Sequence, residues 1–132
     1  MQIEVPPGTT ALSQEAWRVL LSQHIVVPEV EPPVRRLQRR YCLLWGSWRL
    51  HYHGPGGEPV EASTLLLNAA LAGVMVRSRR ELPLNLAVVL TFCADDQECA
   101  LPGVVAHCTE TVGGFKLGIR LRFALPPEPE TQ

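Results

Sequence analysis

Residues 115–123, FKLGIRLRF, decide the fold, because apolar and polar side chains alternate there with a period of two. Successive side chains of a strand point to opposite faces of its sheet, so this alternation predicts a strand with one buried face. The apolar face consists of Phe115, Leu117, Ile119, Leu121 and Phe123, and the opposite face carries Lys116, Arg120 and Arg122. We therefore expect a half-buried antiparallel strand whose five apolar side chains point into the core.

The same alternation occurs at residues 48–53, WRLHYH, where Trp48, Leu50 and Tyr52 share one face. Further apolar runs that indicate strands lie at residues 60–67, 73–78, 86–93 and 103–110. Segments with glycine, proline, asparagine or aspartate separate these runs, as is typical of turns. Six strands without helices between them predict an all-β barrel or sandwich, which we place at residues 41–124.

The N-terminal part of the chain has a different pattern. Residues 13–24 predict a helix with Ser13 as its N-cap and Glu15 in its first turn. Its expected apolar face consists of Leu12, Ala16, Val19 and Leu20. Pro28, Pro32 and Pro33 then predict a stiff, extended linker. Three roles stay open for the helix, namely packing on the barrel, dimerisation and signal output.

These patterns divide the chain into three parts. Residues 1–33 form the N-terminal helix and proline-rich linker, residues 34–125 form the barrel domain, and residues 126–132 form a polar tail that we expect to be disordered. A chain of 132 residues with 46% hydrophobic residues can bury a core of its own.

Composition and charge exclude several classes of function. The formal net charge is −1, whereas proteins that bind nucleic-acid polymers usually carry a domain-wide basic excess. No signal peptide and no apolar run long enough to cross a bilayer is visible, so we expect a cytoplasmic protein without membrane insertion. The four cysteines, Cys42, Cys93, Cys99 and Cys108, lack zinc-site spacing, and we expect them to be small buried residues.

Catalytic motifs are also missing, so we do not expect an enzyme. His51 and His53 lie two residues apart on one strand face, which is half of what a metal site needs. The sequence places no third ligand near them. We therefore interpret them as residues of an exposed strand edge and expect neither a metal nor a cofactor.

Positive charge is concentrated just before the predicted barrel. Residues 34–40, VRRLQRR, hold Arg35, Arg36, Arg39 and Arg40 in a nearly neutral chain. The cluster fits either a solvated hinge or a site for a small anion. An Arg-x-x-x-Arg spacing occurs in two overlapping frames, Arg35 to Arg39 and Arg36 to Arg40.

The order of these features resembles the PilZ domain family, six-stranded β-barrels that serve as bacterial receptors for cyclic di-GMP. Its first motif is Arg-x-x-x-Arg, immediately before the first strand. Its second, Asp/Asn-x-Ser-x-x-Gly, is similar to residues 68–73, NAALAG, with Ala70 where serine is usual. Residues 117–119, LGI, resemble the family's late strand. The resemblance covers roughly residues 34–124.

This resemblance implies a six-stranded antiparallel barrel that binds cyclic di-GMP. The implied ligand-binding residues are Arg36, Arg40, Asn68 and Gly73, with Ala70 at the serine position and Arg35 and Arg39 as the other frame. The frame of Arg36 and Arg40 matches better if Tyr41 begins the first strand. Such a receptor would pass the signal to a protein partner, and a homodimer is compatible with it.

A second interpretation follows from Ala70, which removes a hydroxyl group from the second motif. A hydrogen bond contributes about 0.5–1.5 kcal/mol, or about 1.5–3 kcal/mol to a charged group. The alternative function is therefore a PilZ-like protein-interaction domain that binds no nucleotide and acts in motility, pilus or exopolysaccharide systems.

Overall fold

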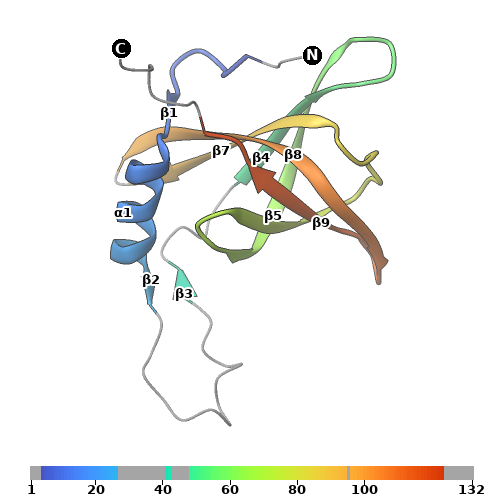
Figure 1. Cartoon of the computed structure of the whole chain (residues 1–132). Coiled ribbons are helices and arrows are strands. Elements are labelled where there is room, and N and C mark those ends of the chain that lie inside the picture. Colours follow the sequence, from blue (N-terminus) through green and yellow to red (C-terminus); the bar gives the residue numbers. More distant parts are fainter. Residues whose placement is uncertain (1–3, 27–40, 43–47, 95, 124–132) are drawn as a thin grey trace, which may run out of the picture.

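A closed, six-stranded antiparallel β-barrel forms the body of the protein in the computed structural model, which describes residues 4–26, 41–42, 48–94 and 96–123 (Figure 1). Its strands are β4 (Trp48–His53), β5 (Pro59–Ala69), β6 (Gly73–Ser78), β7 (Ala87–Ala94), β8 (Gln97–Thr111) and β9 (Gly114–Leu121). They follow the order β8-β7-β4-β5-β6-β9, and a further pairing of β8 with β9 closes the barrel. The prediction of an all-β barrel with an N-terminal helix is confirmed.

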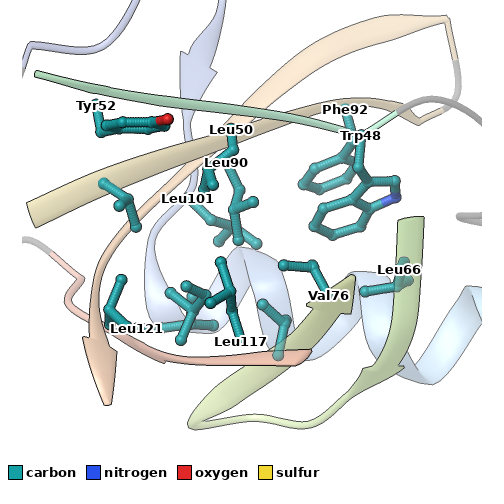
Figure 2. Packing of buried hydrophobic residues seen from close by; sticks show 14 of the residues in the cluster. Trp48, Leu50, Tyr52, Leu66, Val76, Leu90, Phe92, Leu101, Leu117 and Leu121 are labelled. Atoms are coloured by element: carbon teal, nitrogen blue, oxygen red, sulfur yellow. The ribbon is translucent and has the colours of Figure 1, made fainter. Parts of the chain in front are cut away.

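Each of the six strands contributes apolar side chains to one core (Figure 2). Trp48 and Phe92 stack there with ring centroids 4.2 Å apart and planes inclined by 10°. Leu50, Leu90 and Leu101 are fully buried beside them. The alternation of residues 48–53 is confirmed, since Trp48, Leu50 and Tyr52 are buried while their neighbours are not.

Strand β9 presents the face that its sequence predicts. Leu117, Ile119 and Leu121 are buried in the core, whereas Phe115 and Phe123 are only partly buried against it. Both phenylalanines lie where the strand begins or ends, so the barrel encloses them on fewer sides. The charged residues of the opposite face are exposed.

The boundaries of two elements differ from the prediction. Strand β8 begins at Gln97, and its first half pairs with β7 through residues such as Leu101, which faces Leu90. Pro102 lies inside this half and weakens the strand pattern in the sequence.

Tyr41 does not begin the barrel. Tyr41 and Cys42 form the short strand β3 (Tyr41–Cys42), which pairs with β2 (Ile25–Val26) in a separate two-stranded sheet. Among the described residues the barrel starts at Trp48.

The N-terminal segment packs on the barrel. Strand β1 (Thr10–Ala11) pairs in parallel with β8, and helix α1 (Gln14–His24) follows it. Ser13 caps the helix as predicted, since the Ala16 amide donates to its Oγ at 3.0 Å. The predicted apolar face is wrong in part, because Val19 is exposed while Trp17 is fully buried. Trp17 is the largest apolar side chain of the helix, and it determines which side faces the barrel.

Several predictions concern residues outside the described ones. These are the proline-rich linker, the four arginines Arg35, Arg36, Arg39 and Arg40, and the tail at residues 126–132.

The cysteines differ in burial. Cys99 is buried and Cys108 is half-buried, but Cys93 is exposed, so the expectation of buried thiols is wrong for Cys93. In the described part of the chain, no helix has the length and apolar character needed to cross a membrane.

Candidate functional site

A shallow pocket with a volume of about 370 Å³ lies where the turn between β5 and β6 meets strands β8 and β9. Its lining comes from residues 68–70 and 72–75, from Ala106 and His107, and from residues 118–120. The pocket thus brings together Asn68, Ala70 and Gly73, the three positions that the resemblance to the second PilZ motif singles out. A volume in this range suits a small molecule.

Backbone hydrogen bonds hold the turn that forms one wall of this pocket. The Ala70 amide donates to the Gly73 carbonyl oxygen at 2.8 Å, and the Leu121 amide donates to the Ala72 carbonyl oxygen at 2.9 Å. From helix α1, the indole Nε1–H of Trp17 donates to the Ala70 carbonyl oxygen at 3.0 Å. The turn is therefore tied to β9 on one side and to α1 on the other.

Asn68 stands at the entrance to this turn, just after an irregularity in β5. The pairing of β5 with β6 shifts between Leu66 and Asn68, so that Leu67 is an extra residue. Such bulges redirect the side chains beside them and recur next to binding sites. The exposed Asn68 side chain accepts a hydrogen bond from the Ala69 amide at 2.9 Å through Oδ1. Its NH₂ group has no partner among the described residues, so it can donate to a ligand.

Gly73 is required for a close approach between strands. It does not adopt a positive φ, so the turn does not need glycine here for its backbone conformation. It pairs with Arg120 of β9, and a Cβ atom at this position would lie 2.8 Å from the carbonyl oxygen of Ile119. A side chain at residue 73 would therefore push β6 and β9 apart where they border the pocket.

Ala70 contributes only a methyl group to the pocket wall. Its side chain is exposed and belongs to the lining, and the alanines at positions 69 and 72 lie beside it. The wall formed by the turn is consequently apolar apart from Asn68 and the backbone. Serine at position 70 would place a hydroxyl group on this wall.

The residues that line the pocket and that sequence reasoning did not assign to the site include His107, Gly118 and Arg120. An extra residue in β8, Ala106, shifts the pairing with β9 and places His107 opposite Gly118. A Cβ atom on Gly118 would lie 3.2 Å from Cδ2 of His107, so glycine leaves room for the imidazole ring. The polar face of β9 in the sequence already indicates that Arg120 points outward. That pattern does not indicate that Arg120 pairs with Gly73 beside the turn.

Arg120 supplies the positive charge of this pocket. The side chain is exposed, and no carboxylate forms an ion pair with it within the described part of the chain. A guanidinium group can bind a phosphate in a bidentate manner or pair with the O6 and N7 atoms of guanine. The described pocket therefore offers one cation, one amide and an apolar wall. The four arginines of residues 34–40 lie outside the described residues.

His51 lies away from this pocket, on strand β4 between β7 and β5. The expectation of an exposed strand edge for His51 and His53 is wrong, because β4 is paired on both sides and both residues are half-buried. Nε2 of His51 is 2.9 Å from Oγ1 of Thr91, a buried side chain. Burial lowers the pKa of His51 below its ordinary value, the carboxylate of Glu61 opposes this shift, and Arg49 adds to it. No group of three or more potential metal-binding side chains occurs among the residues that the structure describes.

No family model matches the chain, and no curated protein is significantly similar to it. The site therefore has to be judged from its own residues.

Proposed function

We propose that the protein is a cytoplasmic receptor module that binds cyclic di-GMP and passes the signal to a partner protein. The proposal depends mainly on one observation. Asn68, Ala70 and Gly73, which match the second PilZ motif in order and spacing, border the same pocket as Arg120 and His107. The closed six-stranded barrel is also the fold that the resemblance implies.

The chemistry of the pocket suits one part of a cyclic dinucleotide. Cyclic di-GMP carries two phosphate groups and two guanine bases. Arg120 would bind a phosphate or the O6/N7 edge of a guanine, and the NH₂ group of Asn68 would donate to a base acceptor. The alanine-rich wall would lie against the face of a base. We propose binding rather than catalysis, because His107 is the one lining residue with acid–base chemistry and no second acid, base or nucleophile lies beside it in the described lining.

The arginines at residues 34–40 belong to the same proposal. Arg36 and Arg40, or Arg35 and Arg39 in the other frame, would bind the phosphate groups and a guanine edge that Arg120 does not reach. Such contacts are largely electrostatic, so affinity should fall as the salt concentration rises.

A protein-interaction domain without a nucleotide is the second candidate, and Ala70 favours it. The missing hydroxyl group leaves the turn with fewer polar contacts for a ligand. In this case the same surface would bind a protein partner, and its arginines would form part of the contact.

Calorimetric titration with cyclic di-GMP distinguishes the two functions. We expect the parent protein to bind, Arg40→Ala to lose about 1.5–3 kcal/mol of binding free energy, and Arg120→Gln to lose at least about tenfold in affinity. Ala70→Ser should tighten binding. Arg79→Gln is the matched control, because Arg79 is exposed but does not line the pocket.

The receptor function fails if the parent shows no heat of binding at high micromolar ligand and Ala70→Ser does not restore it. Equal losses for Arg120→Gln and Arg79→Gln would show instead that only general charge attracts the ligand, and the pocket would then not be the site.

A further inference from the structure

Trp17 connects the N-terminal helix to the pocket across a long stretch of sequence. Its side chain is fully buried, and its ring meets Phe92 edge-on with centroids 6.0 Å apart and planes inclined by 65°. At the same time its Nε1–H donates to the Ala70 carbonyl oxygen at 3.0 Å. The indole thus packs into the barrel core through its apolar ring and reaches the pocket wall through its polar atom.

The bond acts on the one segment of the pocket that is not part of a strand. Residues 70–72 lie between β5 and β6, and their side chains are exposed. Few apolar contacts hold such a turn, so its conformation depends on its hydrogen bonds. The described bonds to the carbonyl oxygens of Ala70 and Ala72 come from α1 and β9 respectively. Loss of the bond from α1 would leave the turn with the bond from β9 and with its own bond between the Ala70 amide and the Gly73 carbonyl oxygen.

We propose that Trp17 is a positioning residue of the pocket and that the docking of α1 on the barrel is coupled to occupancy of the pocket. The indole holds the turn in the conformation that lines the pocket, so a ligand that binds this conformation also favours the docked helix. Coupling of this kind is reciprocal, because the docked helix must raise ligand affinity by the same factor. Helix α1 then carries the signal from the pocket. The ligand-dependent part of this inference rests on the proposed function.

Trp17→Phe tests the inference, since phenylalanine keeps an aromatic ring next to Phe92 but has no N–H donor. Hydrogen exchange of the Ala70 amide, which bonds within the turn, reports the turn without any ligand. We expect this amide to exchange at least about threefold faster in Trp17→Phe, relative to the amide of Leu90 in the core. Trp48→Phe is the matched control, because Trp48 is an equally buried indole that stacks on Phe92. Trp48→Phe should leave the ratio of the Ala70 and Leu90 amide exchange rates unchanged.

A second measurement needs no variant. In the native protein, the Nε1–H of Trp17 should exchange far more slowly than an exposed indole, and saturating cyclic di-GMP should slow it further. Cyclic di-GMP should bind Trp17→Phe about two- to tenfold more weakly than the parent, as expected for the loss of one neutral hydrogen bond.

The outcomes separate the inference from the proposed function. Unchanged relative exchange of the Ala70 amide in Trp17→Phe, or rapid exchange of the native indole N–H, overturns the inference. Equal affinity of the parent and Trp17→Phe for cyclic di-GMP also overturns it and leaves the receptor function intact. If the parent does not bind cyclic di-GMP, the receptor function fails, and the exchange data alone support or overturn the coupling of α1 to the turn.

Discussion

Replacing Gly73 by alanine should destabilise the barrel at the edge of the pocket. The added Cβ atom would lie 2.8 Å from the Ile119 carbonyl oxygen, well inside the 3.4 Å at which ordinary contact begins. The obstacle is a backbone atom of a paired strand, which cannot rotate away as a side chain can. Residue 73 also pairs with Arg120, so any shift at this point moves the pocket lining on β9.

The magnitude follows from two opposing effects. Forcing an extra carbon into a packed site costs about 1–3 kcal/mol. Alanine restricts the unfolded chain more than glycine does, which raises the free energy of unfolding by about 0.4–1 kcal/mol. At the midpoints of these two ranges the free energy of unfolding falls by about 1.3 kcal/mol, which corresponds to a decrease in Tm of roughly 5 °C for a domain of this size.

Urea and thermal unfolding of Gly73→Ala measure this cost, with Gly56→Ala as the control. Gly56 lies in the turn between β4 and β5, and its added Cβ would meet only the carboxylate end of the flexible Glu58 side chain at 3.0 Å. The control should change the stability by less than about 0.5 kcal/mol. If Gly73→Ala were as stable as the parent, the close approach of β6 to β9 would not be the reason for this glycine.

Three further predictions concern the core and its pH dependence. Ile119→Leu should lower the free energy of unfolding by less than about 1.5 kcal/mol, whereas Ile119→Asp should unfold the domain through an unpaired buried charge. Circular dichroism and thermal unfolding measure both effects. A stable Ile119→Asp variant would refute the face assigned to β9. Phe92→Leu should cost about 2–4 kcal/mol in urea unfolding, since it removes ring contacts with both Trp17 and Trp48, and a loss below about 1 kcal/mol would contradict this. Because burial lowers the pKa of His51, the unfolded chain takes up this proton more readily, so stability should fall as the pH drops below the ordinary value of 6.5. His51→Gln should flatten that dependence in unfolding experiments at several pH values, and an unchanged slope would exclude His51 as its source.

The strand pattern of this chain could be predicted because side-chain alternation reports burial directly. Residues 48–53 and 73–78 are strands over the whole predicted range, and the apolar face of β9 is correct. The first half of β8 was missed because Leu101 and Pro102 interrupt the alternation and Pro102 suggests a turn. Strand β1 was missed because two residues are too few to show a period.

The pocket could be predicted only in the part that is contiguous in sequence. Asn68, Ala70 and Gly73 follow one another in one motif, so their order marks them as a group. Arg120 and His107 join them through the register of β6, β8 and β9, which depends on an extra residue in β8 that no local pattern reveals. The face of α1 was misjudged for a similar reason, because the place that Trp17 fills exists only in the folded barrel.

During synthesis, the barrel can close only after strand β9 has been translated. It completes two ladders at once, with β6 on one side and with the second half of β8 on the other. Until residues 114–121 leave the ribosome, β6 and β8 each present an unpaired edge that another chain can extend. A nascent chain that stops before Gly114 therefore has two unpaired strand edges, which can pair with other chains. When β9 pairs with β6 and β8, both edges are covered in one step. Partially synthesised chains should consequently be far more prone to aggregation than the completed barrel.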